Sequence, residues 1–179
     1  MKKTLTLLAL AAAFMTTAAY AQSTGEKTGI NSTLGIAPTT ADFIKEAAMS
    51  DMLEIAAAKV AEQKGDAQEK TFAAQMITDH TKTTTELKGL VSGNEKDALP
   101  TSLDDSSQKK LDKLNAAKPE DFASEYDPMQ VSAHKDATSL FERYAKGGDD
   151  PKLKDWAGKT LPALQHHLEM AQDMNKNRK

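Results

Sequence analysis

Four long stretches of the chain repeat apolar residues with the period of an α-helix, and this pattern limits the possible folds more than any other feature. The expected helices cover about 40–64, 66–92, 119–146 and 151–175. No strand-type alternation continues for more than a few residues, and no internal repeat is present. Helices of this length need partners for their apolar faces. The sequence therefore predicts an all-α protein built as an antiparallel four-helix bundle.

Residues at the expected helix ends support these boundaries. Thr39 or Thr40 can cap the first helix, and Asp66 followed by Glu69 resembles a capping box at the start of the second. Two prolines fall inside expected helices. Pro128 should kink or restart the third near Asp127, and Pro162 should bend the fourth, because proline lacks the backbone donor.

A polar stretch, 94–118, separates the second and third expected helices. It is too long for an ordinary turn between neighbouring helices, and its segment 104–117 has a short helical pattern of its own. We therefore expect two helical hairpins joined by a long crossover that contains a short extra helix.

Each of the four long helices carries one polar residue on its apolar face, near the middle of its length. At about 100° per residue, the helical wheels select Glu54, His80, His134 and His167, while His166 points away. Such side chains are rarely buried unless they are paired or bind a ligand. Because they lie at similar heights in their helices, we expect these four side chains to meet inside the bundle.

Three imidazoles and one carboxylate suit a single transition-metal ion such as zinc, copper or iron. Asp79 could then orient an imidazole from a second layer around the ion. A di-iron centre is not expected, because such centres use Glu-x-x-His on two helices. Here Ile77, Val131 and Leu164 stand three residues before the histidines.

Two other interpretations of the same residues remain open. The cluster could be a buried hydrogen-bond network that only fixes the packing of the helices, with Glu54 accepting from the histidines. The histidines could also be unrelated to one another. Under either alternative the protein would act through its surface, as a non-catalytic module that contacts an envelope protein or the cell wall.

The N-terminus has the pattern of a secretory signal peptide. Two lysines precede an apolar run that ends in Ala19-Tyr20-Ala21, which predicts cleavage after Ala21. Residues 22–39 are polar, lack periodicity and are expected to form a flexible leader, followed by one domain over 40–176. We expect an exported, periplasmic protein whose mature chain has no transmembrane segment. With no cysteine, its stability depends on the packed core.

Several classes of function are disfavoured. The net charge of −3 and the lack of a basic stripe argue against nucleic-acid binding. The chain has no cysteine nucleophile, no glycine-rich phosphate loop and no recognisable serine triad. We therefore lean against an enzyme and keep only metal-dependent redox chemistry as a catalytic possibility.

Four short motifs resemble those of one known family. They run from Glu54 to Ala61, from Phe72 to His80, from Tyr126 to His134 and from Leu161 to Leu168. The combination is similar to the bacterial ferritin-like family catalogued as domain of unknown function 4142, whose members are often labelled exported or outer-membrane proteins. The resemblance covers about residues 40–174, with Pro128 as a local departure. It implies a ferritin-like bundle with hallmark positions at Glu54, Asp79, His80, His134 and His167, and it implies no known activity.

Overall fold

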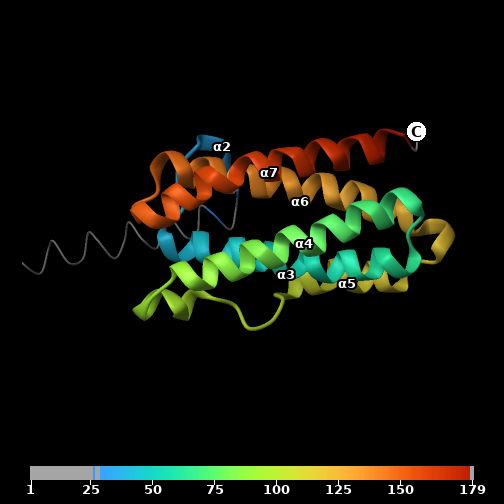
Figure 1. Cartoon of the computed structure of the whole chain (residues 1–179), viewed down its shortest axis with the longest axis horizontal. Helices are drawn as coiled ribbons and strands as arrows, with labels where there is room; N and C mark the ends of the chain where they lie inside the picture. The colour runs from blue at the N-terminus through green and yellow to red at the C-terminus, as the bar shows by residue number, and fades with distance from the viewer. Residues whose placement is uncertain (1–25, 27–28, 178–179) are drawn as a thin grey trace, which may run out of the picture.

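The computed structural model describes residue 26 and residues 29–177, and over this range the regular structure is entirely helical (Figure 1). The predicted all-α class is confirmed. The expected signal peptide, residues 1–21, lies outside the described residues. Among the helices that are described, none has both the length and the apolar character needed to cross a bilayer.

The first hairpin consists of α3 (Thr40–Lys64) and α4 (Ala67–Leu90). Thr39 caps α3, and the predicted capping box at the start of α4 is present: the Asp66 carboxylate accepts from the Glu69 amide, and the Glu69 carboxylate accepts from the Asp66 amide. Gly65 is needed at the turn, because a Cβ there would lie 2.7 Å from the Ala61 carbonyl oxygen. The tight turn fixes α3 and α4 as antiparallel neighbours.

The crossover contains a 3₁₀-helix, η1 (Gly93–Ala98), and the short helix α5 (Asp105–Ala116). The predicted extra helix is therefore present, and it packs along α3. Its C-terminal end is held by Lys64, whose ammonium donates to the carbonyls of Leu114, Asn115 and Ala117. This contact satisfies carbonyls that the end of a helix leaves without a partner.

The second hairpin consists of α6 (Pro119–Gly147) and α7 (Pro151–Lys176). Both internal prolines are accommodated: α6 continues through Pro128 and α7 through Pro162 without ending. The predicted restart near Asp127 does not occur. The residues around Pro128 are fixed by packing, since Tyr126, Asp127 and Gln130 are all buried. Tertiary contacts thus outweigh the loss of one backbone hydrogen bond.

The two hairpins pack face to face, with α3 against α6 and α4 against α7 (Figure 1). The apolar core between them forms two separate clusters rather than one. The first is built around Phe43, Phe141 and Trp156, and the second around Phe72, Phe122 and Tyr126. In each of the four long helices, buried polar residues lie between the residues of one cluster and those of the other. Together they form a polar layer.

An N-terminal segment, comprising Glu26 and residues 29–38, contacts the bundle. It includes a short helix, α2 (Ile30–Leu34), which packs on α6. The Arg143 guanidinium donates to both carboxylate oxygens of Glu26 and, at 2.7 Å, to the Ile36 carbonyl. The sequence predicts no structure here, because the partners of this pair are 117 residues apart and the segment has no periodicity of its own.

Candidate metal centre

His80, His134 and His167 meet in the polar layer of the bundle; we call them the histidine site. The three ring centroids form a nearly equilateral triangle with sides of 5.5, 5.6 and 5.8 Å. One ring nitrogen of each histidine lies within 4.8 Å of those of the other two. Since each of the three histidine residues is at most 2 % exposed, the site is shielded from bulk water.

Each imidazole is held through its outer nitrogen by an oxygen acceptor. The Nδ1 atoms of His80 and His134 lie 2.8 Å from the Asp51 carboxylate and 2.9 Å from the Gln130 carbonyl, respectively. The Nε2 atom of His167 lies 2.9 Å from the carboxylate of Asp79. These bonds fix the orientation of all three rings, as carboxylates and carbonyls commonly do around metal-binding histidines.

Asp51 is itself held by two threonines of α4. The hydroxyls of Thr83 and Thr84 donate to its carboxylate at 2.9 and 3.0 Å. Asp51 is only 6 % exposed, so these bonds replace the water that a carboxylate loses on burial. The arrangement ties α3 to α4 at the level of the site and leaves the His80 ring little freedom to turn.

The hydrogen bonds also determine which nitrogen of each ring carries a lone pair. A carbonyl or an ionised carboxylate only accepts, so the bonded nitrogen must be the N–H donor. In the neutral imidazole the opposite nitrogen is then a free base. These opposite atoms are His80 Nε2, His134 Nε2 and His167 Nδ1, and all three are buried without a hydrogen-bond partner among the described residues. Because the other nitrogens of the rings are engaged, we infer that these three basic nitrogens are the ones that face one another.

Glu54 lies near this interior and is only 1 % exposed. Within the described part of the chain, neither oxygen of its carboxylate has a hydrogen-bond partner. For His134, burial lowers the pKa and the negative charge of Glu54 opposes this effect. The same charge adds to the raised pKa of His80. However, Glu54 does not belong to the group of donor atoms within 4.8 Å, which contains the three histidines alone.

Burial and neighbouring charges set the protonation of the rings. Burial lowers the pKa of His167 to about 4, against the opposing hydrogen bond to Asp79, and it also lowers the pKa of His134. For His80, burial alone would lower the pKa, but the hydrogen bond and charge of Asp51 outweigh it and the pKa is raised. At neutral pH, His134 and His167 are therefore neutral bases, the form that binds a metal ion.

Two more polar side chains of α6 lie on the inward face of the helix, one and two turns before His134. The hydroxyl of Tyr126 and the side-chain amide of Gln130 are fully buried and have no hydrogen-bond partner among the residues that the structure describes. They stand eight and four residues before His134, on one face of the helix. Burial and the nearby Glu54 charge raise the pKa of Tyr126 well above its usual value, so it remains a neutral hydroxyl.

The residues selected from the sequence fall as follows. His80, His134 and His167 come together, Glu54 is buried beside them, and Asp79 binds His167 on the facing helix rather than its own neighbour His80. His166 is exposed, as the helical wheel predicts. Asp51 was not predicted as a residue of the site. Its signal was present, since it lies three residues before Glu54 on the same face of α3.

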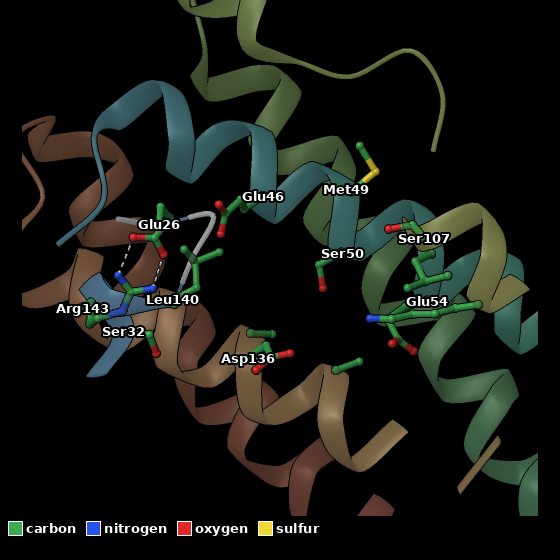
Figure 2. A pocket seen from close by; sticks show the side chains of 15 residues that line it. Glu26, Ser32, Glu46, Met49, Ser50, Glu54, Ser107, Asp136, Leu140 and Arg143 are labelled. Carbon is green, nitrogen blue, oxygen red and sulfur yellow. Dashed lines mark hydrogen bonds and ion pairs between the residues drawn. The ribbon is translucent and has the colours of Figure 1, made fainter. Parts of the chain in front are cut away.

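A groove on the surface leads to Glu54. It has a volume of about 470 Å³ and lies between α3 and α6, with α5 and the N-terminal segment at its borders. Figure 2 shows Ser50 and Asp136 directed into it, with Glu54 and the Glu26–Arg143 pair at opposite ends of the view. None of the three histidines lines this groove. Glu54 is thus the residue that both lines the groove and acts electrostatically on the histidine site.

Fold and site together define an all-helical protein with a buried three-histidine centre. A family model matches residues 25–174, and the chain therefore belongs to the family described as domain of unknown function 4142 (DUF4142), as the sequence motifs indicate. Comparison with curated proteins and with solved structures found no match.

Proposed function

We propose that this protein binds a single transition-metal ion at the histidine site, with Glu54 as an additional ligand or as the counter-charge of the ion. The observation that carries the proposal is the convergence of three buried basic nitrogens whose outer nitrogens are already hydrogen-bonded. Imidazole nitrogens bind zinc at about 2.0–2.1 Å. Nitrogens up to 4.8 Å apart can reach that distance through small movements of the rings.

The donor set favours zinc, copper or iron. Three imidazoles and one carboxylate are borderline to hard donors, and no thiolate exists in this chain. His134 and His167 are neutral bases, and His80 would give up its proton when an ion binds. A single ion fits better than a pair, because Asp51 and Asp79 are engaged with histidines. A buried centre of this kind suits a metal buffer, a sensor or a minor redox protein.

The alternative of a closed hydrogen-bond network is less well supported. In such a network Glu54 would accept hydrogen bonds from the histidines, yet its oxygens have no such partner among the described residues. Unpaired buried polar atoms are costly, and several at one place suggest a missing ligand. This contrast supports metal binding.

We also propose that the bundle is of the ferritin-like type and that the protein acts outside the cytoplasm. Two antiparallel hairpins joined by a long crossover support the first point. The signal-like sequence of residues 1–21 supports the second and predicts a periplasmic protein. Export would be tested by comparing the N-terminal residue of the mature protein with Gln22.

Metal binding can be tested by adding zinc, copper or iron to the chelator-treated protein and following thermal unfolding. At about a hundredfold excess over the dissociation constant, a bound ion should stabilise the protein by about 2.7 kcal/mol. The matched variants are His167→Gln and His166→Gln, adjacent residues of which only His167 is buried. Stabilisation should be lost in the first and kept in the second. The proposal fails if none of the three ions stabilises the wild-type protein, or if both variants respond alike.

A second candidate function is a non-catalytic module that binds an envelope partner through its surface. The observation that favours this candidate is the exposure of three large apolar side chains in the N-terminal segment. Ile30, Leu34 and Ile36 are 56, 66 and 42 % exposed. The double variant His80→Ala/His167→Ala separates the two candidates. If this variant folds and partner capture or the cellular phenotype survives, the histidine site is not what the protein uses.

A further inference from the structure

We propose that the groove between α3 and α6 is the path by which a hydrated cation reaches the histidine site, with Glu54 as the last carboxylate on that path. This inference rests on the proposed metal binding and goes beyond it, because it assigns a role to residues that touch none of the histidines. A buried centre must exchange its ion with solvent, and the bundle needs a route through its wall.

Two features of the lining link this groove to the histidine site. Glu54 is almost completely buried, yet it lines the groove, and its oxygens are unpaired among the described residues. On α6 the lining residues Ala133 and Ala137 flank His134 in the sequence. The groove therefore ends beside residues of α3 and α6 that belong to, or directly adjoin, the polar layer of the histidine site.

The charges along the groove suit a cation. Glu46 and Asp136 line it together with Glu54. The negative charge of Glu26 is matched by Arg143, and Lys110 contributes one positive charge, so the lining keeps an acidic excess. Clefts with charge of one sign concentrate oppositely charged ions and raise their association rates. Ser50, directed into the groove, adds a hydroxyl and leaves space (Figure 2).

The test measures the rate at which the metal-free protein takes up Zn²⁺, followed by competition with a chromogenic chelator. Ser50→Phe should obstruct the groove and slow uptake by about tenfold, while the affinity at equilibrium stays within about threefold of wild type. Asp136→Lys should slow uptake several-fold at low salt and less at high salt, because screening weakens steering. Neither residue is among the hydrogen-bond partners found for the three histidines in the described part of the chain.

Matched controls carry the same changes away from the groove. Ser132→Phe places the same bulk on the exposed side of α6, and Glu62→Lys changes charge on an exposed position of α3. Both should take up Zn²⁺ at the wild-type rate. Thermal unfolding of each metal-free variant verifies its fold. If Ser50→Phe does not fold, the exposed Asp136 still permits the electrostatic test.

The possible outcomes distinguish a failure of the proposed uptake route from a failure of the proposed metal binding. Slower uptake in the two groove variants alone, with affinity retained, supports the route. If wild type binds Zn²⁺ and both groove variants load at its rate, the route is wrong and metal binding stands. If wild type takes up no Zn²⁺ at all, metal binding fails for this ion and the route fails with it.

Discussion

Two buried charged groups of this bundle differ in their hydrogen bonding. Arg143 is 8 % exposed, and its guanidinium donates to both oxygens of Glu26 and to the Ile36 carbonyl. Glu54 is 1 % exposed, and its oxygens have no hydrogen-bond partner among the described residues. Packing alone does not require the second arrangement, since an unpaired buried carboxylate is unfavourable. The first group therefore serves the fold, whereas the second is expected to serve a ligand.

Breaking the paired group should give the largest loss of stability. Arg143→Met leaves the carboxylate of Glu26 without its partner, and we expect the free energy of unfolding to fall by about 3 kcal/mol. The affinity for metal should not change, because Arg143 is not part of the histidine site. Urea unfolding of the metal-free protein measures the effect.

Arg143→Lys is the control for this prediction. It keeps the charge but loses the two-pronged contact, so its loss of stability should be smaller. Equal stability of wild type and Arg143→Met would show that the contact with the N-terminal segment contributes nothing to stability. Arg143 and Glu54 would then not differ in their role in the fold.

Removing the unpaired group should have the opposite sign. Glu54→Leu replaces a buried carboxylate by an apolar side chain of similar size, and the metal-free protein should become more stable by about 2 kcal/mol. The same variant should bind metal more weakly, because the ion loses its carboxylate. Thermal unfolding with and without metal measures both effects.

Glu62→Leu, at an exposed position of α3, should change stability by less than about 0.5 kcal/mol. A metal-free Glu54→Leu protein that is less stable than wild type would mean that Glu54 has a stabilising partner. The polar layer would then be structural.

The helices and the inward-facing residues could be predicted from the sequence because both depend on local periodicity. The bounds of α3 agree with the expectation, and the apolar face of α4 correctly identifies His80 as buried. Periodicity tells which side of a helix is buried but not which residue lies opposite it. The helical wheel places Asp51 on the inward face of α3 beside Glu54, but it does not give its partner His80, which is on another helix, 29 residues away.

The same limit applies to the N-terminal segment and to Pro128. Glu26 is held by a contact across 117 residues, which no local pattern reveals. The predicted restart at Pro128 was wrong, because the buried residues around this proline keep α6 continuous despite its local helix-breaking preference. The features that could not be predicted therefore depend on contacts between residues that are far apart in the sequence.

A smaller effect should follow from removing the support of one imidazole. Asp79→Ala deprives His167 Nε2 of its acceptor, so the ring loses its fixed orientation and Nδ1 no longer holds the lone pair in one direction. We expect metal affinity to fall about 10- to 100-fold, or about 2 kcal/mol. Calorimetric titration with the ion that stabilises wild type measures the change.

The control is Gln75→Ala, which removes an exposed neighbour that donates to Asp79 at 3.3 Å. Its affinity should remain close to that of wild type. If the Asp79→Ala variant binds as tightly as wild type, the hydrogen bond to His167 does not prepare the site.

The smallest expected effect concerns Glu46. This carboxyl is neither as well paired as Arg143 nor as deeply buried as Glu54. It is half-buried, and its pKa is raised to about 7 from 4.5 by burial and by the charges of Glu26 and Asp42, against the attraction of Arg143. A carboxyl with a raised pKa favours the folded state in its protonated form. Its contribution to stability is therefore full below about pH 4.5 and is lost as the pH rises through about 7.

Glu46→Gln should remove this pH dependence. The variant should match wild type near pH 5 and exceed its free energy of unfolding at pH 8 by about 1 kcal/mol, a value reduced for the partial exposure of the side chain. Urea unfolding at the two pH values measures the difference, with Glu62→Gln as the exposed control. A difference that is the same at both pH values would show that Glu46 titrates normally. The acidic excess of the groove at neutral pH would then be larger, because Glu46 would be fully charged beside Asp136 and Glu54.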